Sequence, residues 1–311
     1  MKNIQRAVEL LKRGDVVAAP TETVYGLFAD ACRDTAIQRI YQIKGRPSCN
    51  PLIIHVSGIE MAKHFAVFSE TDLRIATYFW EINSFPLTLI LKAMNNMISK
   101  FATAGLDTVA IRVPHHPIPS RLITMFGGPL AAPSANTSNG LSPTSFDMVY
   151  RDLGKQLPLI LDGGQCSVGI ESTILDLTTD PFSILRPGGV PREDIEDFVG
   201  YKVNGPEGLG DETIVAPGMM KRHYSPNLPL RCNALTATEG EAFIAFGPSD
   251  VPYDFNLSKT GNLREAARNL FYALQTLDRP ERYSGIAVAP IPNFDLGVGI
   301  NDRLNRASHK L

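Results

Sequence analysis

Polar side chains follow the apolar runs of this sequence just past the predicted strand ends, where α/β sheets place their ligands. The apolar run 16–19 is followed by PTETVYG at 20–26, which supplies two threonine hydroxyls, at Thr21 and Thr23, and the carboxylate of Glu22. This cluster is suited to binding a polar small molecule, and a capped turn explains it equally well.

Cations that could neutralise an anion occur at two further places. Lys44 and Arg46, with one residue between them, stand at the end of a helical pattern, close to Asn50, whose amide can both donate and accept. The alternative interpretation is that both cations only interact with the dipole at the C-terminus of the helix. Thr108 and Arg112 are four residues apart on a predicted strand, and therefore share one face. An arginine that points into the protein needs an anionic partner. That partner is more often a carboxylate of the protein, in a structural ion pair, than a ligand.

Small and hydroxyl-bearing residues form the remaining clusters. AAPSAN at 131–136 follows an apolar run and leads to Ser142. Small residues let a ligand approach the backbone closely. An ordinary surface loop would have the same composition. EST at 171–173 opens a predicted strand, and LRPG at 185–188 closes another. Each cluster is weak evidence alone, whereas the whole series in this order is specific.

Several function classes are disfavoured. The sequence has no GxxxxGK[ST] loop, no complete GxGxxG fingerprint and no GxSxG elbow, and its six histidines lack metal-ligand spacing. Its four cysteines form no CxxC pair, which predicts reduced thiols. Lys plus Arg is 30 against 32 for Asp plus Glu, so no global field attracts nucleic acid. No apolar run approaches the roughly 18 residues that span a bilayer, and we expect a cytoplasmic protein without membrane contact.

The elements that must position these clusters alternate between helix and strand. Apolar spacing predicts helices over 4–14, 34–45 and 69–80, with Asp34 capping the second and a Ser69/Asp72 capping box opening the third. Strands are predicted over 16–19, 52–56, 87–91, 109–113, 157–161, 173–177 and 182–185. Several strands are too close for helical crossovers, so we expect a mixed sheet in an α/β domain.

The length predicts more than one domain, because 311 residues exceed what one hydrophobic core usually organises. We assign residues 1–204 to a catalytic domain, 205–232 to a linker and 233–311 to a small second domain. In the last segment, strands over 241–246 and 285–289 flank an amphipathic helix over 262–277, which makes one βαβ unit.

The motifs PTETVYGL, KGRP with NPL, AIRVP, APSAN, ESTI, LRPG and PGMMKRHYSP, between Val16 and Pro226, resemble those of the YrdC-like family, and specifically its two-domain threonylcarbamoyl-AMP synthases. The resemblance implies a YrdC-like domain with a twisted mixed sheet, a linker and a small Rossmann-like domain. It also implies a nucleotidyltransferase that makes L-threonylcarbamoyladenylate from L-threonine, bicarbonate or CO2, and ATP, with release of pyrophosphate. This is the first step of threonylcarbamoyladenosine modification of tRNA next to the anticodon.

The resemblance further implies roles for individual residues. Threonine would be bound by Thr23, His55, Arg112, Ala132 and Ser172. ATP would be bound by Lys44, Arg46, Asn50, Thr108, Ser134, Ser142, Arg186 and Tyr224, with Lys44 and Arg46 serving the chemistry. Mg²⁺ would arrive with ATP and take no ligand from protein side chains. The product would pass to proteins that transfer the threonylcarbamoyl group to tRNA, with at most weak contact between this chain and RNA.

The physical chemistry of these residues agrees with that reaction. A carbamate oxygen attacks the α-phosphorus of ATP and pyrophosphate leaves, which requires positioning and charge neutralisation rather than a protein nucleophile. Arg112 suits a carboxylate by bidentate pairing, and Lys44, Arg46 and Arg186 suit phosphates. Reactive intermediates benefit from a cover, which the linker could supply through Gly218, Lys221, Arg222 and Tyr224; a plain tether is the alternative.

Two other functions compete. A carbamoyl transferase of the hydrogenase-maturation type also contains a YrdC-like domain, but it needs more cysteines and a longer chain than this one offers. A double-stranded RNA-binding module would use the same basic face for phosphate contacts, and the net charge of −2 weighs against it.

Overall fold

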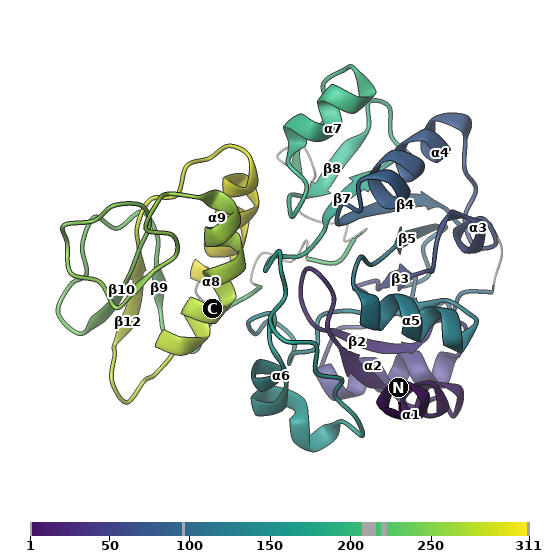
Figure 1. Cartoon of the computed structure of the whole chain (residues 1–311), viewed down its shortest axis with the longest axis horizontal. Coiled ribbons are helices and arrows are strands. Elements are labelled where there is room, and N and C mark those ends of the chain that lie inside the picture. The colour runs from purple at the N-terminus through teal and green to yellow at the C-terminus, as the bar shows by residue number, and fades with distance from the viewer. Residues whose placement is uncertain (1, 95–96, 207–215, 219–222, 310–311) are drawn as a thin grey trace.

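The computed structural model describes residues 2–94, 97–206, 216–218 and 223–309, which form two α/β bodies (Figure 1). The larger body is built around an eight-stranded sheet and the smaller around a four-stranded sheet, over the part of the chain that the structure describes. The linker residues Lys221 and Arg222 lie outside the described residues.

The larger sheet is mixed, as predicted. β3 (Ile53–His55) pairs with β5 (Thr108–Arg112), and β4 (Leu87–Lys92) with β7 (Thr173–Asp176), in parallel, while the other neighbouring pairs are antiparallel. The strands follow one another across the sheet in the order β1 (Val17–Ala19), β2 (Gly26–Asp30), β6 (Leu130–Ala131), β3 (Ile53–His55), β5 (Thr108–Arg112), β4 (Leu87–Lys92), β7 (Thr173–Asp176) and β8 (Ser183–Arg186).

Alternation along the strands divides the apolar side chains between two faces of this sheet. Val17 and Ala19 pack with helices α1 (Lys2–Lys12) and α5 (Pro117–Phe126). Ala18, between them, packs into the main core with Ile37 and Ile40 of α2. The remaining helical elements of this body are α2 (Asp34–Lys44), α3 (Ile59–Ala62), α4 (Glu70–Ala76), the π-helical turn Thr77–Ile82, α6 (Phe146–Leu153), the 3₁₀ turn Gly154–Gln156 and α7 (Arg192–Val199).

Two local predictions about helix starts have different outcomes. The capping box is confirmed, because the Asp72 backbone N–H donates to Ser69 Oγ at 3.1 Å and the Ser69 N–H donates to Asp72 Oδ2 at 2.8 Å. The prediction that Asp34 caps α2 is wrong. Arg33 occupies the cap position, and the Asp34 carboxylate instead accepts a hydrogen bond from Ser99 Oγ at 2.6 Å.

The predicted strand 157–161 is also wrong. This segment forms one isolated bridge, between Ile160 and Ala18, because β1 spans only three residues and offers little edge to pair with. The sequence prediction also missed β2, which returns antiparallel to β1 directly after the polar cluster at 20–26. That cluster therefore lies in a tight connection between two paired strands.

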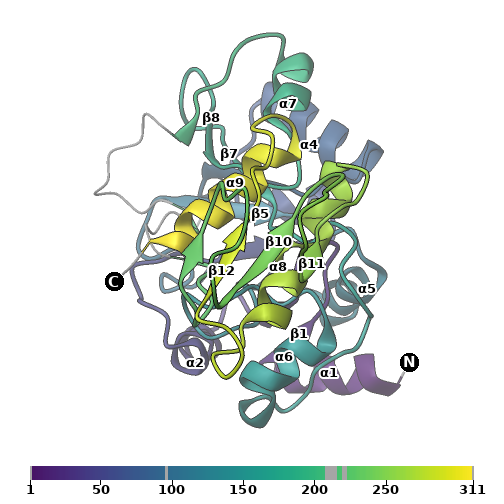
Figure 2. The same cartoon turned by 90° about the vertical axis from the view of Figure 1, so that its left-hand side faces the viewer.

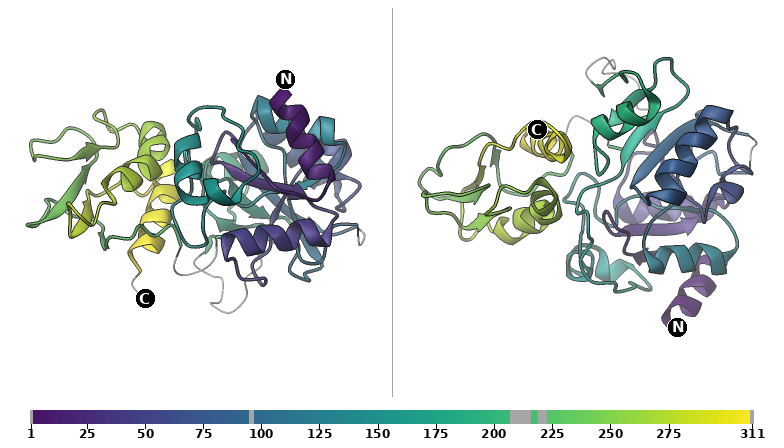
Figure 3. Two further views of the ribbon diagram at one scale, coloured as in Figure 1. Left: turned by 90° about the horizontal axis from the view of Figure 1, so that it is seen from below. Right: turned by 45° about the horizontal axis from the view of Figure 1, so that its top comes forward.

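The smaller body is a parallel sheet with two helices on the side that faces the larger body (Figures 1, 2 and 3). Its strand order is β11 (Phe255–Asn256), β10 (Glu241–Ala245), β12 (Gly285–Val288) and β9 (Leu230–Arg231), and its helices are α8 (Leu263–Leu277) and α9 (Leu296–Ser308). The predicted βαβ unit is therefore confirmed and extended. β9 lies within the segment 205–232 that we assigned to the linker, so the end of that segment is a strand of the second domain.

The two bodies share an apolar cluster. Val24, Ile170 and Tyr224 pack in the same cluster as Leu270 and Phe271 of α8. The second domain is thus docked directly onto the region of the polar strand ends.

Candidate active site

A cavity of about 50 Å³ lies where the polar clusters converge. Nine of the thirteen predicted site residues line it: Thr23, Arg46, His55, Arg112, Ala132, Ser134, Ser172, Arg186 and Tyr224. We call Thr23, His55 and Arg112 the strand wall, because they lie on or beside β2, β3 and β5. We call Pro217, Gly218, His223 and Tyr224, which also line the cavity, the linker wall.

Arg112 dominates the strand wall. Its Nη1 donates to Thr23 Oγ1 at 3.0 Å, and its Nη2 forms an ion pair with Glu22, with all three side chains buried. Thr23 Oγ1 also lies 2.8 Å from Thr21 Oγ1. Arg112 Nε is buried and has no partner among the described residues. An oriented guanidinium with donor capacity to spare is suited to binding a carboxylate.

His55 is a neutral group in this site. Burial, and then the positive charge of Arg112, lower the pKa of His55 to about 3. Its Nδ1 lies 3.2 Å from the Ile53 carbonyl, and its ring meets Phe28 edge-on at 5.4 Å. His55 therefore offers a fixed, uncharged ring face beside the arginine.

Arg46 and Asn50 act as one unit. Arg46 Nη2 donates to Asn50 Oδ1 at 2.6 Å and to the Pro51 carbonyl at 2.9 Å. Asn50 is fully buried and does not line the cavity, so it lies behind the guanidinium that does. Burial lowers the pKa of Arg46 to about 10, which leaves it a cation near neutral pH.

Lys44 is buried behind the loop that carries Ser134. Its Nζ donates at 2.5 Å to each of the Ser134 and Asn136 carbonyls. Burial, and then the charge of Arg46, lower the pKa of Lys44 well below its usual value. In this structure the lysine orders the 134–136 loop and does not line the cavity.

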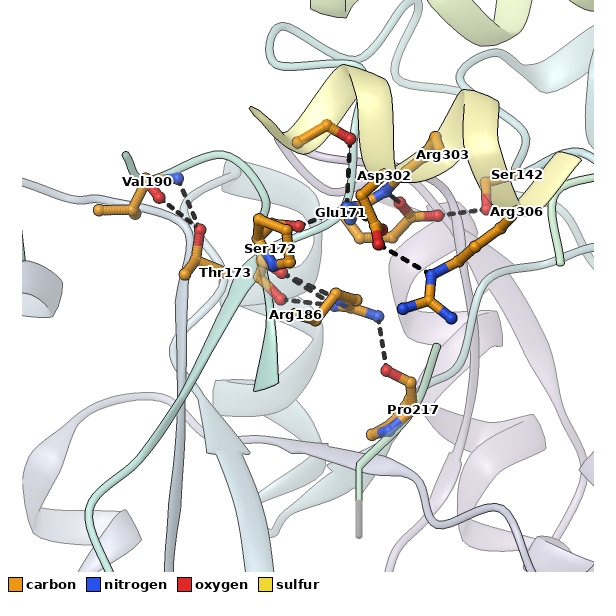
Figure 4. A network of polar contacts seen from close by, with 12 residues as sticks. Ser142, Glu171, Ser172, Thr173, Arg186, Val190, Pro217, Asp302, Arg303 and Arg306 are labelled. Atoms are coloured by element: carbon orange, nitrogen blue, oxygen red, sulfur yellow. Dashed lines mark hydrogen bonds and ion pairs between the residues drawn. The ribbon is translucent and has the colours of Figure 1, made fainter. Parts of the chain in front are cut away.

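Arg186 joins the strand ends to the linker wall (Figure 4). Its Nη2 donates to the Ser172 carbonyl at 3.0 Å and to Ser172 Oγ at 3.1 Å, and its Nη1 donates to the Pro217 carbonyl at 3.2 Å. Gly218 adopts a φ of +87°, and a Cβ there would lie 2.8 Å from Arg186 Cδ and 2.9 Å from Tyr224 Oη. Only glycine fits this close approach without strain.

Ser142 and Thr108 occupy different positions from the nine lining residues. Ser142 is fully buried and donates to a carboxylate oxygen of Glu171 beside the cavity. Thr108 is at the far end of β5 from Arg112. Four residues of strand separate two side chains on one face by roughly 13 Å. The structure therefore does not bring Thr108 into the group.

Sequence reasoning missed several residues of the site. Glu171 and His223 line the cavity. Both stand inside the motifs that carry the family resemblance, so their position beside Ser172 and Tyr224 is a usable signal. Arg303, described below, comes from α9 and gave no signal, because a charged residue on an amphipathic helix is expected to face solvent.

The described residues contain no group of three or more His, Cys, Asp or Glu side chains that could hold a metal ion. Likewise, none of their helices is long and apolar enough to cross a bilayer.

Family models match most of the chain. One, described as Telomere recombination and covering Sua5, YciO and YrdC proteins, matches residues 9–188. A second, described as Threonylcarbamoyl-AMP synthase, C-terminal domain, matches residues 190–309. The chain belongs to the Sua5/YrdC family. The YrdC-like resemblance and the two-domain organisation implied by the sequence motifs are therefore confirmed.

Individual relatives in the Sua5/YrdC family extend over nearly the whole chain. The threonylcarbamoyl-AMP synthase of Pyrococcus abyssi is 39% identical over 98% of this chain and 94% of its own length. That of Bacillus subtilis is 37% identical over 98% and 92%. The crystal structure of P. abyssi Sua5 complexed with L-threonine superposes with a TM-score of 0.89 at 37% identity, over 98% of this chain and 94% of that one.

Proposed function

We propose that this protein is an L-threonylcarbamoyladenylate synthase, which condenses L-threonine, bicarbonate or CO2, and ATP and releases pyrophosphate. The observation that carries the proposal is the convergence of Arg112, Arg46 and Arg186 on one cavity. One guanidinium is needed for the threonine carboxylate, and others for a triphosphate that loses pyrophosphate. The names of the full-length relatives support the same reaction.

The strand wall is the proposed threonine site. Arg112 would bind the carboxylate, using the Nε that has no partner among the described residues, while Thr23 and Ser172 would bind the remaining polar groups. His55 and Ala132 would limit the space around the side chain. A neutral His55 adds no second charge that would compete with Arg112 for the carboxylate.

The other half of the cavity is the proposed nucleotide site. Arg46, Arg186 and Ser134 line it and are suited to phosphate oxygens, and Tyr224 offers a ring and a buried hydroxyl without a partner in the described chain. Lys44, Asn50 and Ser142 would act from behind by holding the loop, Arg46 and Glu171. Thr108, at the other end of β5, would contact a part of ATP that extends beyond this cavity.

The reaction then needs no protein nucleophile. Bound threonine and bicarbonate yield a carbamate with release of water, and a carbamate oxygen then forms a bond to the α-phosphorus as the bond to pyrophosphate breaks. Arg46 and Arg186 would neutralise charge on the leaving pyrophosphate. Mg²⁺ would arrive on the triphosphate, since magnesium prefers phosphate oxygens and water. Mg²⁺ would take no ligand from Glu171, which lines the cavity, because its two carboxylate oxygens are bound to Ser142 and Arg303.

We further propose that the product passes to proteins that transfer the threonylcarbamoyl group to tRNA, and that this occurs in the cytoplasm. The four free cysteines agree with a reducing compartment. The mixed anhydride of the product is readily hydrolysed, so direct transfer to the next protein would protect it.

The decisive experiment is incubation with ATP, Mg²⁺, threonine and bicarbonate while pyrophosphate is assayed and the adenylate is followed by mass spectrometry. Pyrophosphate release is expected to require threonine and bicarbonate together, because the attacking oxygen exists only in the carbamate. Release at the same rate with ATP alone would overturn the proposal.

A further inference from the structure

The second domain places one arginine inside the first. Arg303, on α9, has no exposed surface, and its Nε donates to Glu171 Oε2 at 2.9 Å (Figure 4). Its Nη1 donates to the Pro187 carbonyl. A fully buried arginine is costly unless it is paired, so these contacts are what keeps it in place.

Glu171 connects Arg303 to the cavity. One oxygen of its carboxylate faces Arg303, and the other accepts a hydrogen bond from Ser142. Glu171 itself lines the cavity and directly precedes Ser172, which Arg186 holds through three hydrogen bonds. A shift of this carboxylate would therefore disturb the strand end that carries Ser172.

Arg303 also supports the linker wall. Its Cζ lies over the Tyr224 ring, 5.4 Å from the centroid, and Tyr224 packs on Phe271 of α8 with centroids 5.6 Å apart. Cation–π contacts are strongest where water is excluded, and both side chains here are buried. The second domain thus holds the ring from two of its helices.

Backbone packing fixes the position of α9 and α8 against the site. A Cβ on Gly299 would lie 3.2 Å from the Gly188 carbonyl oxygen, and a Cβ on Gly169 would lie 2.3 Å from Arg268 Cα. Such close approach leaves the helices little freedom to move relative to the strand ends. The helix that carries Arg303 therefore has a fixed position relative to the site.

We propose that the second domain completes the active site, with Arg303 as a positioning residue that holds Glu171 and the Tyr224 ring in place for the synthase reaction. This inference rests on the proposed function. Docking alone does not require a buried charge, because well-packed apolar side chains usually serve at least as well. Outside its own helix, among the described residues, Arg303 contacts Glu171 and Tyr224, which line the cavity, and the carbonyl of Pro187, which directly follows Arg186.

The titration of Glu171 distinguishes positioning from docking. Burial raises the pKa of Glu171, but the charges of Arg303 and Arg186 and the Ser142 hydrogen bond outweigh it, and the net pKa is lowered. The buried phenol of Tyr224 is also coupled to this carboxylate, and the charge of Glu171 contributes to raising the pKa of Tyr224. Without Arg303, burial raises the pKa of Glu171 with less opposing positive charge. The pKa of Glu171 should then rise, and the acid limb of kcat/KM should move to higher pH.

The test compares the full-length protein with Arg303→Met, Arg303→Lys and the control Arg231→Met. Arg231 pairs with Glu241 within the second domain, on β9 and away from the cavity. Arg303→Met is expected to lower kcat/KM for threonine and ATP by about 10- to 100-fold, the range typical of residues that orient a reacting group. It should also move the acid limb of kcat/KM to higher pH. Arg303→Lys should fall between, and Arg231→Met should match the wild type.

An Arg303→Met variant that does not fold would not test the positioning role, so a double variant that removes both charges of the pair is included. Arg303→Met/Glu171→Gln removes both buried charges and should fold. If Arg303 acts through Glu171, this double variant should be no less active than Glu171→Gln alone. A further tenfold loss in the double variant would overturn the role assigned to the pair.

Two outcomes separate this inference from the proposed function. An active wild type whose Arg303→Met variant shows a lower Tm but unchanged kcat/KM and pH profile would leave Arg303 as a docking contact and overturn the inference. If the wild type releases no pyrophosphate, the proposed function fails. The hold of Arg303 on Glu171 is then decided by carboxyl NMR, which should show the Glu171 resonance titrating at higher pH in Arg303→Met than in the wild type; an unchanged titration would overturn it.

Discussion

The strand wall and the linker wall of the cavity differ in what holds them. Arg112 and Thr23 are fixed by Glu22 and Thr21, which lie in the connection between β1 and β2 of the same domain. Tyr224, in contrast, is positioned by α8 and α9 of the second domain.

This difference separates the wall that would recognise threonine from the wall that the second domain completes. A wall built on paired strands exists whenever the first domain is folded, because its hydrogen bonds are made within that domain. In the linker wall, Arg186 of the first domain holds Pro217, but the Tyr224 ring is supported by α8 and α9 only when the second domain is docked. We therefore expect changes in the strand wall to affect threonine first, and changes around Tyr224 to affect ATP first.

The largest effect is expected for Arg112→Ala. It removes the proposed carboxylate partner and leaves Glu22 buried without its cation, which typically costs about 3–5 kcal/mol of stability. We expect kcat/KM for threonine to fall by on the order of 10³-fold, from the loss of a bidentate charged contact. Arg39→Ala, which breaks an exposed pair with Asp15, is the control and should change neither quantity. Unchanged threonine affinity in a folded Arg112→Ala variant would remove this wall from the threonine site.

Arg46→Ala should act on the nucleotide. We expect turnover at saturating threonine to fall about 100-fold, in the range seen when a donor to developing charge is removed, while the threonine Kd changes by less than about threefold. Pyrophosphate release and calorimetry of threonine binding give the two values. The reverse pattern, normal turnover with weakened threonine binding, would exchange the roles of the two halves.

The neutral His55 gives a pH test of the strand wall. Because its pKa is lowered to about 3 from 6.5, the unfolded chain binds a proton below pH 6.5 that the native state refuses. Stability is therefore lost as pH falls from about 6.5 toward 3, by about 2.5 kcal/mol at pH 4.5. In His55→Gln this part of the acid sensitivity should disappear, as followed by urea unfolding at several pH values. Parallel acid profiles of the two proteins would show that His55 is not buried in its neutral form.

The smallest effect is expected for Tyr224→Phe. The hydroxyl has no partner among the described residues, so unfolding stability should change by less than about 0.5 kcal/mol. The KM for ATP should rise about 3- to 10-fold, the value of one hydrogen bond to the nucleotide. Tyr224→Ala, which also loses the contacts with Arg303 and Phe271, should be clearly worse. A Phe variant identical to the wild type in KM would place the hydroxyl away from ATP.

Most of the site was predictable because its residues stand in short motifs at strand ends. Nine of the thirteen predicted residues line one cavity, since strand ends of one sheet necessarily come together. Thr108 does not line the cavity, and its contact with the nucleotide stays a prediction. A period of two correctly put it on the face of Arg112, but strand rise separates the two side chains along β5.

The sequence by itself determined the family, the mixed α/β fold and the chemical character of the strand wall, because these depend on local motifs and on alternation along the chain. Tertiary structure alone decided which charges are buried and what they face. Lys44 and Arg46 stand two positions apart in the sequence, yet one orders a loop and the other lines the cavity. Arg303 reaches Glu171 across 132 positions of sequence, and no local pattern encodes such a contact. Burial and pairing are set by the packing of whole domains, which is why the second domain's share in the site became visible only in the folded chain.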